Sequence, residues 1–493
     1  MAKNVLAFDL GASSGRAMGG SFDGERLTLT ELHRFSNDPV MVGSTFHWDT
    51  LRLLHEIKTC ISKANLSGMS FDSLGIDTWG VDFGLITKSG RMLGNPVHYR
   101  DARNVGMADK VFSQVPSTEI YASTGIQTMD FNTLFQLAWL RDNEPELLEQ
   151  AESLLFTPDL LSYFLSGVRV NEYSIASTSQ MLNARNRTWD KALLDKLGIP
   201  THFLSEITDP GTRLGALTPA ICNELGVAPM DVMAVAGHDT ACAVAAAPVE
   251  RDGRTWAYLS CGTWSLLGLE LPEPLINDAT CAANFTNEGG VAHTTRFLKN
   301  IIGLWIMQET RRQWIRESGP ISFKEIDTLT AAAAPLKRFI DPDHPSFAQP
   351  CNMPKNINEY LKATGQPVCE TRGDVSRLIT ESLALKYRHA IENLEKLYGK
   401  KIDVLHIVGG GVQDKLLCAY TANATGKTVV AGPIEATAVG NVLCQLVASG
   451  DLANFDEARD CVRRSFAPAV YEPTDRDVWE DAYARFLSVT GLE

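Results

Sequence analysis

The sequence lacks several features that would assign it to a common class. No stretch approaches the roughly 18 consecutive apolar residues that a membrane-spanning helix requires. The ten cysteines form no CxxC pair and HExxH is absent, which disfavours a zinc site. Residues 1–10 contain no apolar core followed by a small-residue cleavage site, so we expect no secretion signal. The cysteines are therefore interpreted as buried thiols of a reducing, cytoplasmic compartment.

Basic residues are also scarce relative to acidic ones. Asp and Glu number 59 and Lys and Arg number 45, which gives a formal net charge of −14, and there is no Lys/Arg-rich run. Such a surface repels phosphate backbones, so we expect neither a nucleic acid nor an anionic membrane as partner. Hydrophobic residues make up 44% of the 493 residues and charged residues 21%, which is typical of a folded chain with about three domains or two large ones.

The order of predicted elements is repeated in the two halves. The first half contains predicted strands, a small-residue turn and a helix in the order Asn4–Asp9, Gly11–Gly15, Arg16–Phe22, Leu27–Phe35, helix Trp48–Ala64 and Ser73–Gly80. The second half gives Trp256–Ser260, turn Cys261–Thr263, Trp264–Leu271, helix Ser376–Tyr398 and Val404–Val408. The repeat predicts an α/β fold of two lobes, residues 1–247 and 248–493, with a ligand cleft between the lobes.

Two turns at matching positions are candidates for binding a polyphosphate. In Asp9–Arg16 the glycines and small side chains let a ligand approach the backbone amides, and Asp9 could hold a divalent cation through water. Neither Walker A nor GxGxxG is present, and a plain hairpin with a capping Asp is the alternative. The segment Ser260–Ser265 repeats the arrangement, and a matched pair favours two loops that clamp one phosphate chain.

Three further segments could act on a substrate. In Val235–Ala241 a strand runs into Asp239 at a helix start, where the carboxylate could accept a hydroxyl proton or merely cap the helix. His238 could contact substrate or brace the turn. In Val408–Asp414 three glycines leave room for a nucleoside, or make a flexible turn. In Gly75–Phe83 a Trp beside acids could stack on a sugar, or be a core Trp beside a solvated Asp.

Taken in order, six segments resemble the FGGY carbohydrate kinases, within the superfamily of actin-like ATPases. They are DLGASSGR, GIDTWGVDF, GHDTA, SCGTWS, LKNIIGLW and VGGGVQD, and the resemblance runs from Val5 to about Gln445. It implies two RNase H-like lobes, the first carrying the sugar site, the first phosphate loop and the catalytic Asp. The second lobe would carry the second phosphate loop and the adenosine site.

The resemblance also implies a role for individual residues. It implies ATP contacts at Ala12, Ser13, Ser14, Gly15, Arg16, Thr263, Gln308 and Gly410. It implies sugar contacts at Gly80, His238, Asp239, Thr240 and Asn300, with Asp239 as the catalytic base. The implied cofactors are ATP and Mg²⁺, with Asp9 near the metal. Close relatives are sometimes drawn with a loop disulfide, for which only Cys351 and Cys369 could serve here, and the sequence leaves that pairing open.

Finer motifs narrow the expected substrate. Five segments are most similar to the family members that phosphorylate L-rhamnulose at O1, namely DLGASSGR, TWGVDF, YRDAR, TNEGG and LKNIIGLW. The alternatives are a kinase of L-fuculose, D-xylulose or glycerol, an actin- or chaperone-like clamp that binds a protein, and a non-catalytic sugar-binding regulator. The expected partners are thus a small ketose and ATP. The sequence leaves open a monomer or a small homo-oligomer.

Overall fold

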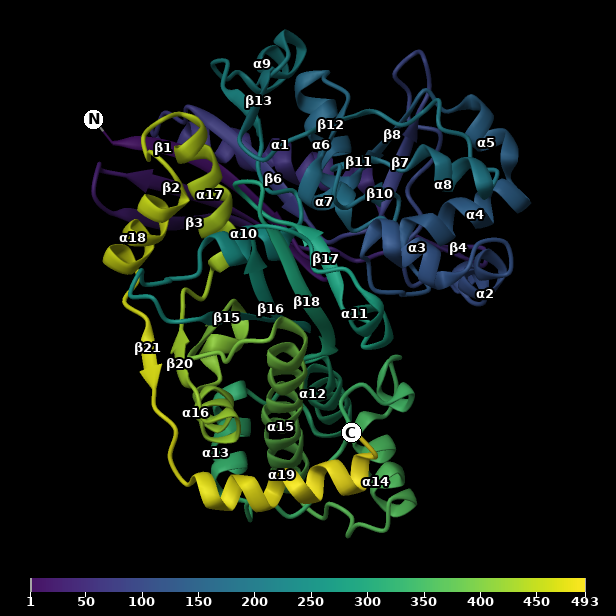
Figure 1. Ribbon diagram of the computed structural model, residues 1–493. Coiled ribbons are helices and arrows are strands. Elements are labelled where there is room, and N and C mark those ends of the chain that lie inside the picture. The colour runs from purple at the N-terminus through teal and green to yellow at the C-terminus, as the bar shows by residue number, and fades with distance from the viewer. Residues whose placement is uncertain (1, 493) are drawn as a thin grey trace. The chain divides into compact units, whose positions relative to one another are not determined.

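A computed structural model describes residues 2–492 and divides the chain into two compact units (Figure 1). The first unit comprises Met1–Ala246, Glu270–Phe297 and Ala436–Ser465, and the second comprises Ala247–Leu269, Leu298–Glu435 and Phe466–Glu493. The sequence division at residue 248 falls beside the first change of unit. A single division there assigns residues 270–297 and 436–465 to the second lobe, whereas in the structure both segments belong to the first unit.

The first unit is built on a six-stranded sheet with the order β13-β14-β6-β1-β2-β3. Its strands are β1 (Lys3–Leu10), β2 (Ser14–Phe22), β3 (Leu27–Ser36), β6 (Ser73–Thr78), β13 (Thr212–Ala216) and β14 (Asp231–Ala234). The central strands β1, β6 and β14 are parallel, while β2 and β3 form an antiparallel meander beside β1. The carboxyl ends of the three parallel strands therefore lie at one edge, where ligands of open α/β sheets bind.

Helices cover both faces of this sheet. The helices α10 (Asp239–Ala245) and α17 (Ala436–Ala448) pack on each other, and α17 packs on β1 and β6. The helices α1 (Thr50–Leu66) and α6 (Thr157–Ser166) also pack together, with α6 on β6 and β14. Close approach of α10 and α17 requires a glycine, since a Cβ on Gly440 would lie 1.8 Å from the carbonyl oxygen of Cys242.

The remaining elements of the first unit form smaller substructures. Those up to residue 150 are β4 (Val40–Val42), β5 (Thr45–His47), β7 (Phe83–Ile86), η1 (Ala102–Asn104), α2 (Met107–Phe112), α3 (Ser117–Thr124), α4 (Thr133–Asn143) and α5 (Pro145–Gln150). The others are β8 (Ser153–Phe156), β9 (Val170–Glu172), α7 (Tyr173–Ser177), β10 (Leu182–Asn183), β11 (Thr188–Trp189), α8 (Lys191–Lys196), β12 (Glu206–Thr208), α9 (Pro219–Leu225), α11 (Asp278–Ala282), β17 (Thr286–Gly289) and α18 (Phe455–Ser465).

The second sheet has the order β17-β18-β16-β15-β19-β20-β21. Its further strands are β15 (Trp256–Cys261), β16 (Trp264–Leu271), β18 (Thr295–Ile302), β19 (Val404–Val408), β20 (Thr428–Ala431) and β21 (Ala469–Tyr471). Strand β15 is antiparallel to β16 and parallel to β19, which is parallel to β20. The order β18-β16-β15-β19-β20 thus repeats the order β3-β2-β1-β6-β14, and the predicted duplication of one topological unit is confirmed.

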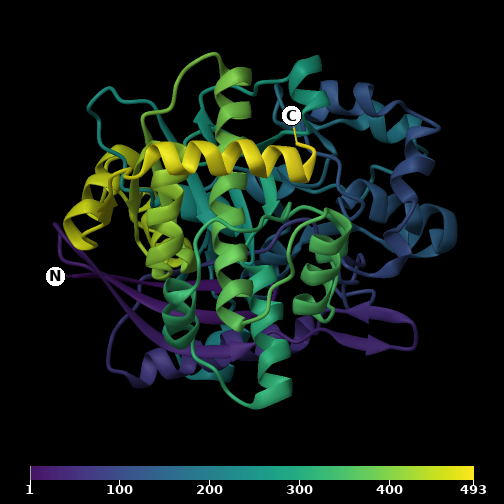
Figure 2. The same ribbon diagram turned by 90° about the horizontal axis from the view of Figure 1, so that it is seen from below.

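The helices of the second unit surround the long α15 (Arg372–Tyr398). Figure 2 shows α19 (Arg476–Thr490) lying across α15, with which it is in contact. The other helices are α12 (Trp305–Ser318), α13 (Phe323–Ala332), η2 (Pro345–Phe347), α14 (Met353–Ala363), η3 (Gly410–Gln413) and α16 (Lys415–Thr425). Over residues 2–492 no helix combines the length and the apolar character needed to cross a membrane.

Most predicted elements are confirmed, with ends shifted by a few residues. The helix predicted to begin at Trp48 begins at Thr50, because Asp49 is its N-cap and accepts a hydrogen bond from the amide of Arg52. The strands Trp264–Leu271 and Val404–Val408 have the predicted bounds. Cys351 and Cys369, whose pairing the sequence left open, are both free thiols.

Candidate active site

Two carboxylates lie side by side at the carboxyl ends of the parallel strands of the first unit. Asp9 of β1 is in register with Asp77 of β6. The guanidinium of Arg16 donates to Oδ2 of Asp9 from both Nε and Nη2, at 2.8 Å each. Asn441 of α17 donates to Oδ2 of Asp77 at 2.7 Å. The register of a parallel pair therefore brings together two acids that are 68 positions apart in the sequence.

Asp77 is the acid of this group whose charged form is most disfavoured by its surroundings. Its side chain is fully buried, and its Oδ1 has no hydrogen-bond partner among the described residues. Burial raises the pKa of Asp77 well above its usual range, and the negative charges of Asp9 and Asp239 raise it further. The sequence had suggested that a Trp beside acids in Gly75–Phe83 contacts a sugar, but the acid Asp77 is buried within the sheet.

Asp239 is the first residue of α10, as the sequence predicted, but it does not cap the helix. His238 occupies the N-cap position, and no side chain makes a cap hydrogen bond. The carboxylate of Asp239 is one-third exposed, and its Oδ1 accepts a hydrogen bond from Oγ1 of Thr240 at 3.1 Å. The interpretation of Asp239 as an ordinary N-cap is therefore wrong, because its carboxylate is directed away from the helix amides.

Buried polar groups hold the turn before Asp239. The amide of Thr78 donates to the carbonyl of Gly237 at 2.8 Å, which fixes the turn to the end of β6. The amide of Gly237 donates to Oε2 of Glu172 at 2.8 Å, and the amide of His238 donates to Oγ of Ser174 at 3.3 Å. Burial raises the pKa of Glu172, although hydrogen bonds from Ser174 and from backbone amides oppose this increase. The position of Asp239 is therefore set from outside its own helix.

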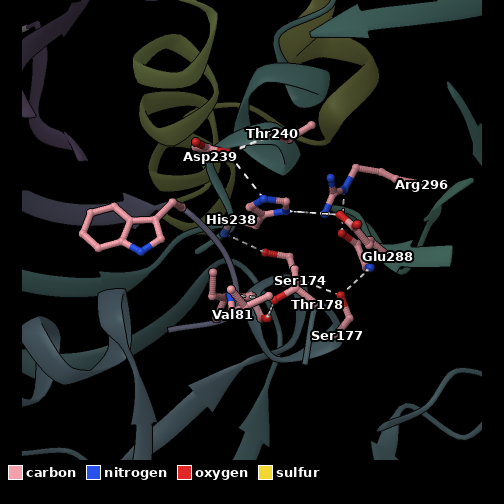
Figure 3. Close-up of polar contacts among 12 residues, drawn as sticks. Val81, Ser174, Ser177, Thr178, His238, Asp239, Thr240, Glu288 and Arg296 are labelled. Atoms are coloured by element: carbon pink, nitrogen blue, oxygen red, sulfur yellow. Dashed lines mark hydrogen bonds and ion pairs between the residues drawn. The ribbon is translucent and has the colours of Figure 1, made fainter. Parts of the chain in front are cut away.

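Both ring nitrogens of His238 contact protein groups (Figure 3). Nδ1 lies 3.0 Å from Nη2 of Arg296 and 3.3 Å from Oε2 of Glu288. Nε2 lies 3.4 Å from Oδ1 of Asp239. Of the two roles that the sequence left open for His238, contact with substrate or bracing of the turn, these contacts favour bracing.

Gly80 lies in a tight turn next to the same network. The residue after it, Val81, has a φ of 68°, and its amide donates to Oγ1 of Thr178 at 3.1 Å (Figure 3). A Cβ on Gly80 would lie 3.2 Å from that same Oγ1, which is tighter than ordinary van der Waals contact. The turn therefore requires a very small residue at position 80, beside the helix α7 that also supplies Ser174.

Of the two sequence interpretations of this segment, the core Trp is confirmed for Trp79, but the solvated Asp is wrong for Asp82. Trp79 is buried and packs against Trp48, with ring centroids 4.0 Å apart. Both indole nitrogens donate to Oδ2 of Asp82, at 2.6 Å from Trp48 and 2.9 Å from Trp79. Burial raises the pKa of Asp82 to about 6, although these hydrogen bonds oppose the increase. Trp79 is thus a core residue, and Asp82 is buried rather than solvated.

The first predicted phosphate loop is a tight turn whose backbone is held from the end of β3. The amide of Gly11 donates to the carbonyl of Ser14 at 2.9 Å, and Ser13 and Ser14 are exposed. The buried Asn37 donates from its side chain to the carbonyl of Gly11 at 2.9 Å and from its amide to the carbonyl of Ser13 at 3.1 Å. Asn37 lies outside every motif, so its role could not be predicted from the sequence.

The second loop is held by backbone groups at the start of a helix. Leu304 and Trp305 donate their amides to the carbonyls of Gly262 and Thr263, at 3.0 and 3.1 Å. Oγ1 of Thr263 donates to Oε1 of Gln308 at 3.3 Å, so two predicted ATP contacts of the second unit lie together. Gly410 is exposed at the start of η3, and the half-buried Asn300 lies in β18.

The carboxylates of the first unit fit a divalent cation that is held indirectly. The unpaired Oδ1 of Asp77 and the mutual repulsion of Asp9, Asp77 and Asp239 would both be relieved by positive charge. Within residues 2–492 no three His, Cys, Asp or Glu side chains are grouped closely enough to chelate a metal directly. A magnesium ion would therefore be held through water and phosphate oxygens, which Mg²⁺ favours.

Sequence reasoning found the acids at the strand ends and missed the groups that hold them. Glu288 lies inside the quoted motif TNEGG, but the motif suggested no role for it. Arg296, Glu172 and Asn441 lie in no motif, and only their tertiary contacts identify them. No pattern of spacing signals such partners, because each comes from a distant element.

Two family models match almost the whole chain. The N-terminal domain of the FGGY family of carbohydrate kinases matches residues 4–246, and the C-terminal domain of the same family matches residues 257–449.

Curated relatives match the chain over nearly their full length. The chain is 45% identical to a rhamnulokinase of Bacteroides thetaiotaomicron over 486 residues, which is 99% of each chain. It is 39% identical to a rhamnulokinase of Bacillus subtilis over 471 residues, which is 96% of each chain.

Solved structures share the fold at low sequence identity. A gluconate kinase of Lactobacillus acidophilus superposes with a TM-score of 0.79 at 14% identity, covering 99% of this chain and 98% of that one. The glycerol kinase of Plasmodium falciparum with ADP gives a TM-score of 0.79 at 13% identity, covering 100% and 99%. These similarities confirm the predicted two-lobed α/β fold.

Proposed function

The chain belongs to the FGGY family of carbohydrate kinases, and we propose that it transfers the γ-phosphoryl group of ATP to O1 of L-rhamnulose. The family and the curated relatives named rhamnulokinase support this substrate. The observation that carries the proposal is Asp239. Its carboxylate lies at the start of a helix, is one-third exposed and makes no N-cap hydrogen bond. Such a group is suited to receive a hydroxyl proton.

The reaction needs one proton acceptor and little other covalent help. As O1 of the open-chain ketose attacks the γ-phosphorus, an O1–P bond forms and the bond between that phosphorus and the bridging oxygen of ADP breaks. The O1 proton passes to Asp239, which later releases it to solvent. Thr240 donates to Oδ1 of Asp239, so Oδ2 is the oxygen that we assign to the substrate hydroxyl.

The sugar is held by the groups around Asp239. We assign sugar contacts to Gly80, His238, Asp239 and Thr240 of the first unit and to Asn300 of the second. The turn at Gly80 lies beside the network of Figure 3, and His238 contributes through its hold on Asp239.

ATP is bound by small-residue turns from both units. We assign to it the loop Ala12–Arg16 of the first unit and Thr263, Gln308 and Gly410 of the second. The exposed residues Ser13 and Ser14 suit contacts with phosphate oxygens, and the Thr263–Gln308 pair offers a hydroxyl and an amide. Asp9 and Asp77 would hold Mg²⁺ through water, and the ion supplies positive charge that offsets the charge of the phosphates.

The proposal is tested by measuring ADP release with L-rhamnulose, L-fuculose, D-xylulose and L-ribulose in the presence of ATP and Mg²⁺. We expect the highest kcat/KM with L-rhamnulose, and a product that NMR identifies as the 1-phosphate. A higher kcat/KM with another ketose would contradict L-rhamnulose as the substrate and identify that ketose in its place. Absence of any sugar-dependent ADP release would contradict a kinase and favour a clamp that binds a protein.

A further inference from the structure

A buried ion pair lies directly behind His238 (Figure 3). Glu288 comes from β17 and Arg296 from β18, and their side chains are 7% and 0% exposed. Oε2 of Glu288 and Nη2 of Arg296 lie 3.1 Å apart, and Nε of Arg296 donates to the carbonyl of Gly289 at 2.8 Å. Removing two charges from water costs free energy unless neighbouring groups compensate through hydrogen bonds, so the presence of this buried pair requires an explanation.

Both members of the pair carry their charge. Burial raises the pKa of Glu288, but the positive charge of Arg296 is the largest of several effects that lower it, and the net pKa is below the ordinary value. A guanidinium remains protonated at every pH at which proteins work, and it can donate hydrogen bonds but cannot accept them. Arg296 is therefore a fixed donor next to the imidazole of His238.

A fixed donor at Nδ1 selects one tautomer of a neutral imidazole. Nη2 of Arg296 is the nearer group to Nδ1, at 3.0 Å against 3.3 Å for Oε2 of Glu288. If Nδ1 accepts from Arg296, the ring proton is on Nε2, 3.4 Å from Oδ1 of Asp239. In the opposite tautomer the lone pair of Nε2 would face the carboxylate, which is repulsive. At Nδ1 the carboxylate of Glu288 is paired with the nearer guanidinium of Arg296, whereas no cation among the described residues pairs with Asp239 at Nε2, so the contacts taken together favour the proton on Nε2.

We propose that Glu288 and Arg296 are positioning residues, which hold His238 with its proton on Nε2 so that it donates to Oδ1 of Asp239. Oδ1 then receives donors from His238 and Thr240, and Oδ2 faces the sugar hydroxyl. The inference rests on the proposed function, because it assigns Glu288 and Arg296 to the orientation of the proposed base. We assign neither residue a contact with substrate.

The central variant is Glu288→Gln, which keeps the size of the side chain and removes the charge that holds Arg296. We expect kcat to fall about 10- to 100-fold, because the orientation of a catalytic group strongly affects rate. The KM values for sugar and ATP should change less than about threefold. Arg296→Lys keeps the positive charge, removes the guanidinium donor at Nδ1, and should give the same separation of kcat from KM.

The matched control is a second buried Arg–Glu pair of the first unit. Oε2 of Glu270 lies 2.8 Å from Nη2 of Arg459, with side chains 9% and 11% exposed. Glu270 also accepts a hydrogen bond from Oγ1 of Thr294, and Arg459 also donates to the carbonyl of Val244. Glu270→Gln should keep kcat within about twofold of wild type. Equal kcat losses in Glu270→Gln and Glu288→Gln would reduce the Glu288 pair to a structural role and overturn the proposal.

The tautomer can be measured without any change to the pair. In the ¹⁵N–¹H spectrum of the imidazole rings at pH 8, the His238 signals are those lost in His238→Asn. We expect the pattern of a neutral ring protonated at Nε2, and a ring protonated at Nδ1 would overturn the proposal even if Glu288→Gln does not fold. If the wild-type enzyme phosphorylates none of the ketoses, the proposed function fails, while this spectrum still tests the hydrogen-bond network.

Discussion

The two units share one arrangement of strands but differ in charge at the positions that matter. Strand β1 corresponds to β15 and β6 to β19, and their registers make Asp9 equivalent to Ser260 and Asp77 equivalent to Val408. The first unit therefore carries two buried acids where the second carries a hydroxyl and an apolar side chain. Two acids at this edge are costly to bury, so the difference indicates that the first unit is specialised for chemistry.

The two turns also differ in how they are held. The first loop is fixed by one side chain, that of Asn37, together with its amide. The second loop is fixed by backbone amides of Leu304 and Trp305. Backbone hydrogen bonds to a loop require a residue small enough to let the two chain segments come close. A side-chain hydrogen bond requires one particular functional group. The same turn is thus obtained by two physical means.

The largest effect is expected at Asp239, the proposed base of the first unit. Asp239→Asn removes the proton acceptor and keeps the shape, so we expect kcat for sugar phosphorylation to fall about 10²- to 10⁴-fold. Nucleotide affinity, measured by titration, should change little. The control is Asp49→Asn, which alters a true N-cap of the same unit and should leave kcat unchanged, since Asn caps as well as Asp. A near-normal kcat in Asp239→Asn would exclude Asp239 as the base.

The second loop can be disturbed at Gly303, which precedes the two residues whose amides donate to the loop. A Cβ on Gly303 would lie 2.4 Å from Oγ of Ser265 and 2.8 Å from its amide nitrogen. We expect Gly303→Ala to shift the turn, to raise the KM for ATP about tenfold, and to destabilise the protein by about 1–3 kcal/mol. Gly94→Ala is the control, because no atom lies within 4 Å of the added Cβ. An unchanged KM for ATP would show that this loop does not contribute to nucleotide binding.

The third variant makes the first unit more like the second. Asp77→Asn removes a buried charge, so we expect stability at pH 8 to rise by roughly 1–2 kcal/mol, while turnover falls. Because the pKa of Asp77 is raised in the folded state, the folded protein binds the proton more tightly, and wild-type stability declines as pH rises above the ordinary Asp value. The gain should therefore shrink as pH falls toward 4 in urea unfolding.

The exposed Asp195 provides the control for this measurement. Asp195→Asn should change stability by less than about 0.5 kcal/mol at either pH. If Asp77→Asn is less stable than wild type at pH 8, Asp77 is stabilised by its surroundings, and the contrast drawn with Val408 does not hold.

The smallest effect is expected at the side-chain brace of the first loop. Asn37→Ala removes one hydrogen bond to Gly11, so we expect a loss of about 0.5–1.5 kcal/mol, seen as a several-fold higher KM for ATP. The exposed Asn65 is the control, since its side chain makes only a 3.4 Å contact with the carbonyl of Gly226. Equal effects of Asn37→Ala and Asn65→Ala on this KM would show that the first loop needs no side-chain brace.

The sequence by itself determined the duplicated fold, the two small-residue turns and the acid at the start of α10. These follow from local patterns, namely apolar runs that end in Asp or Gly, and local patterns depend on neighbours in the chain. Only the tertiary structure decided that Trp79 is a core residue, that Asp82 is buried between indoles, and that Asp9 lies beside Asp77. It alone also places Glu288 and Arg296 behind His238, because strand register and the burial of charge depend on segments that are distant in sequence.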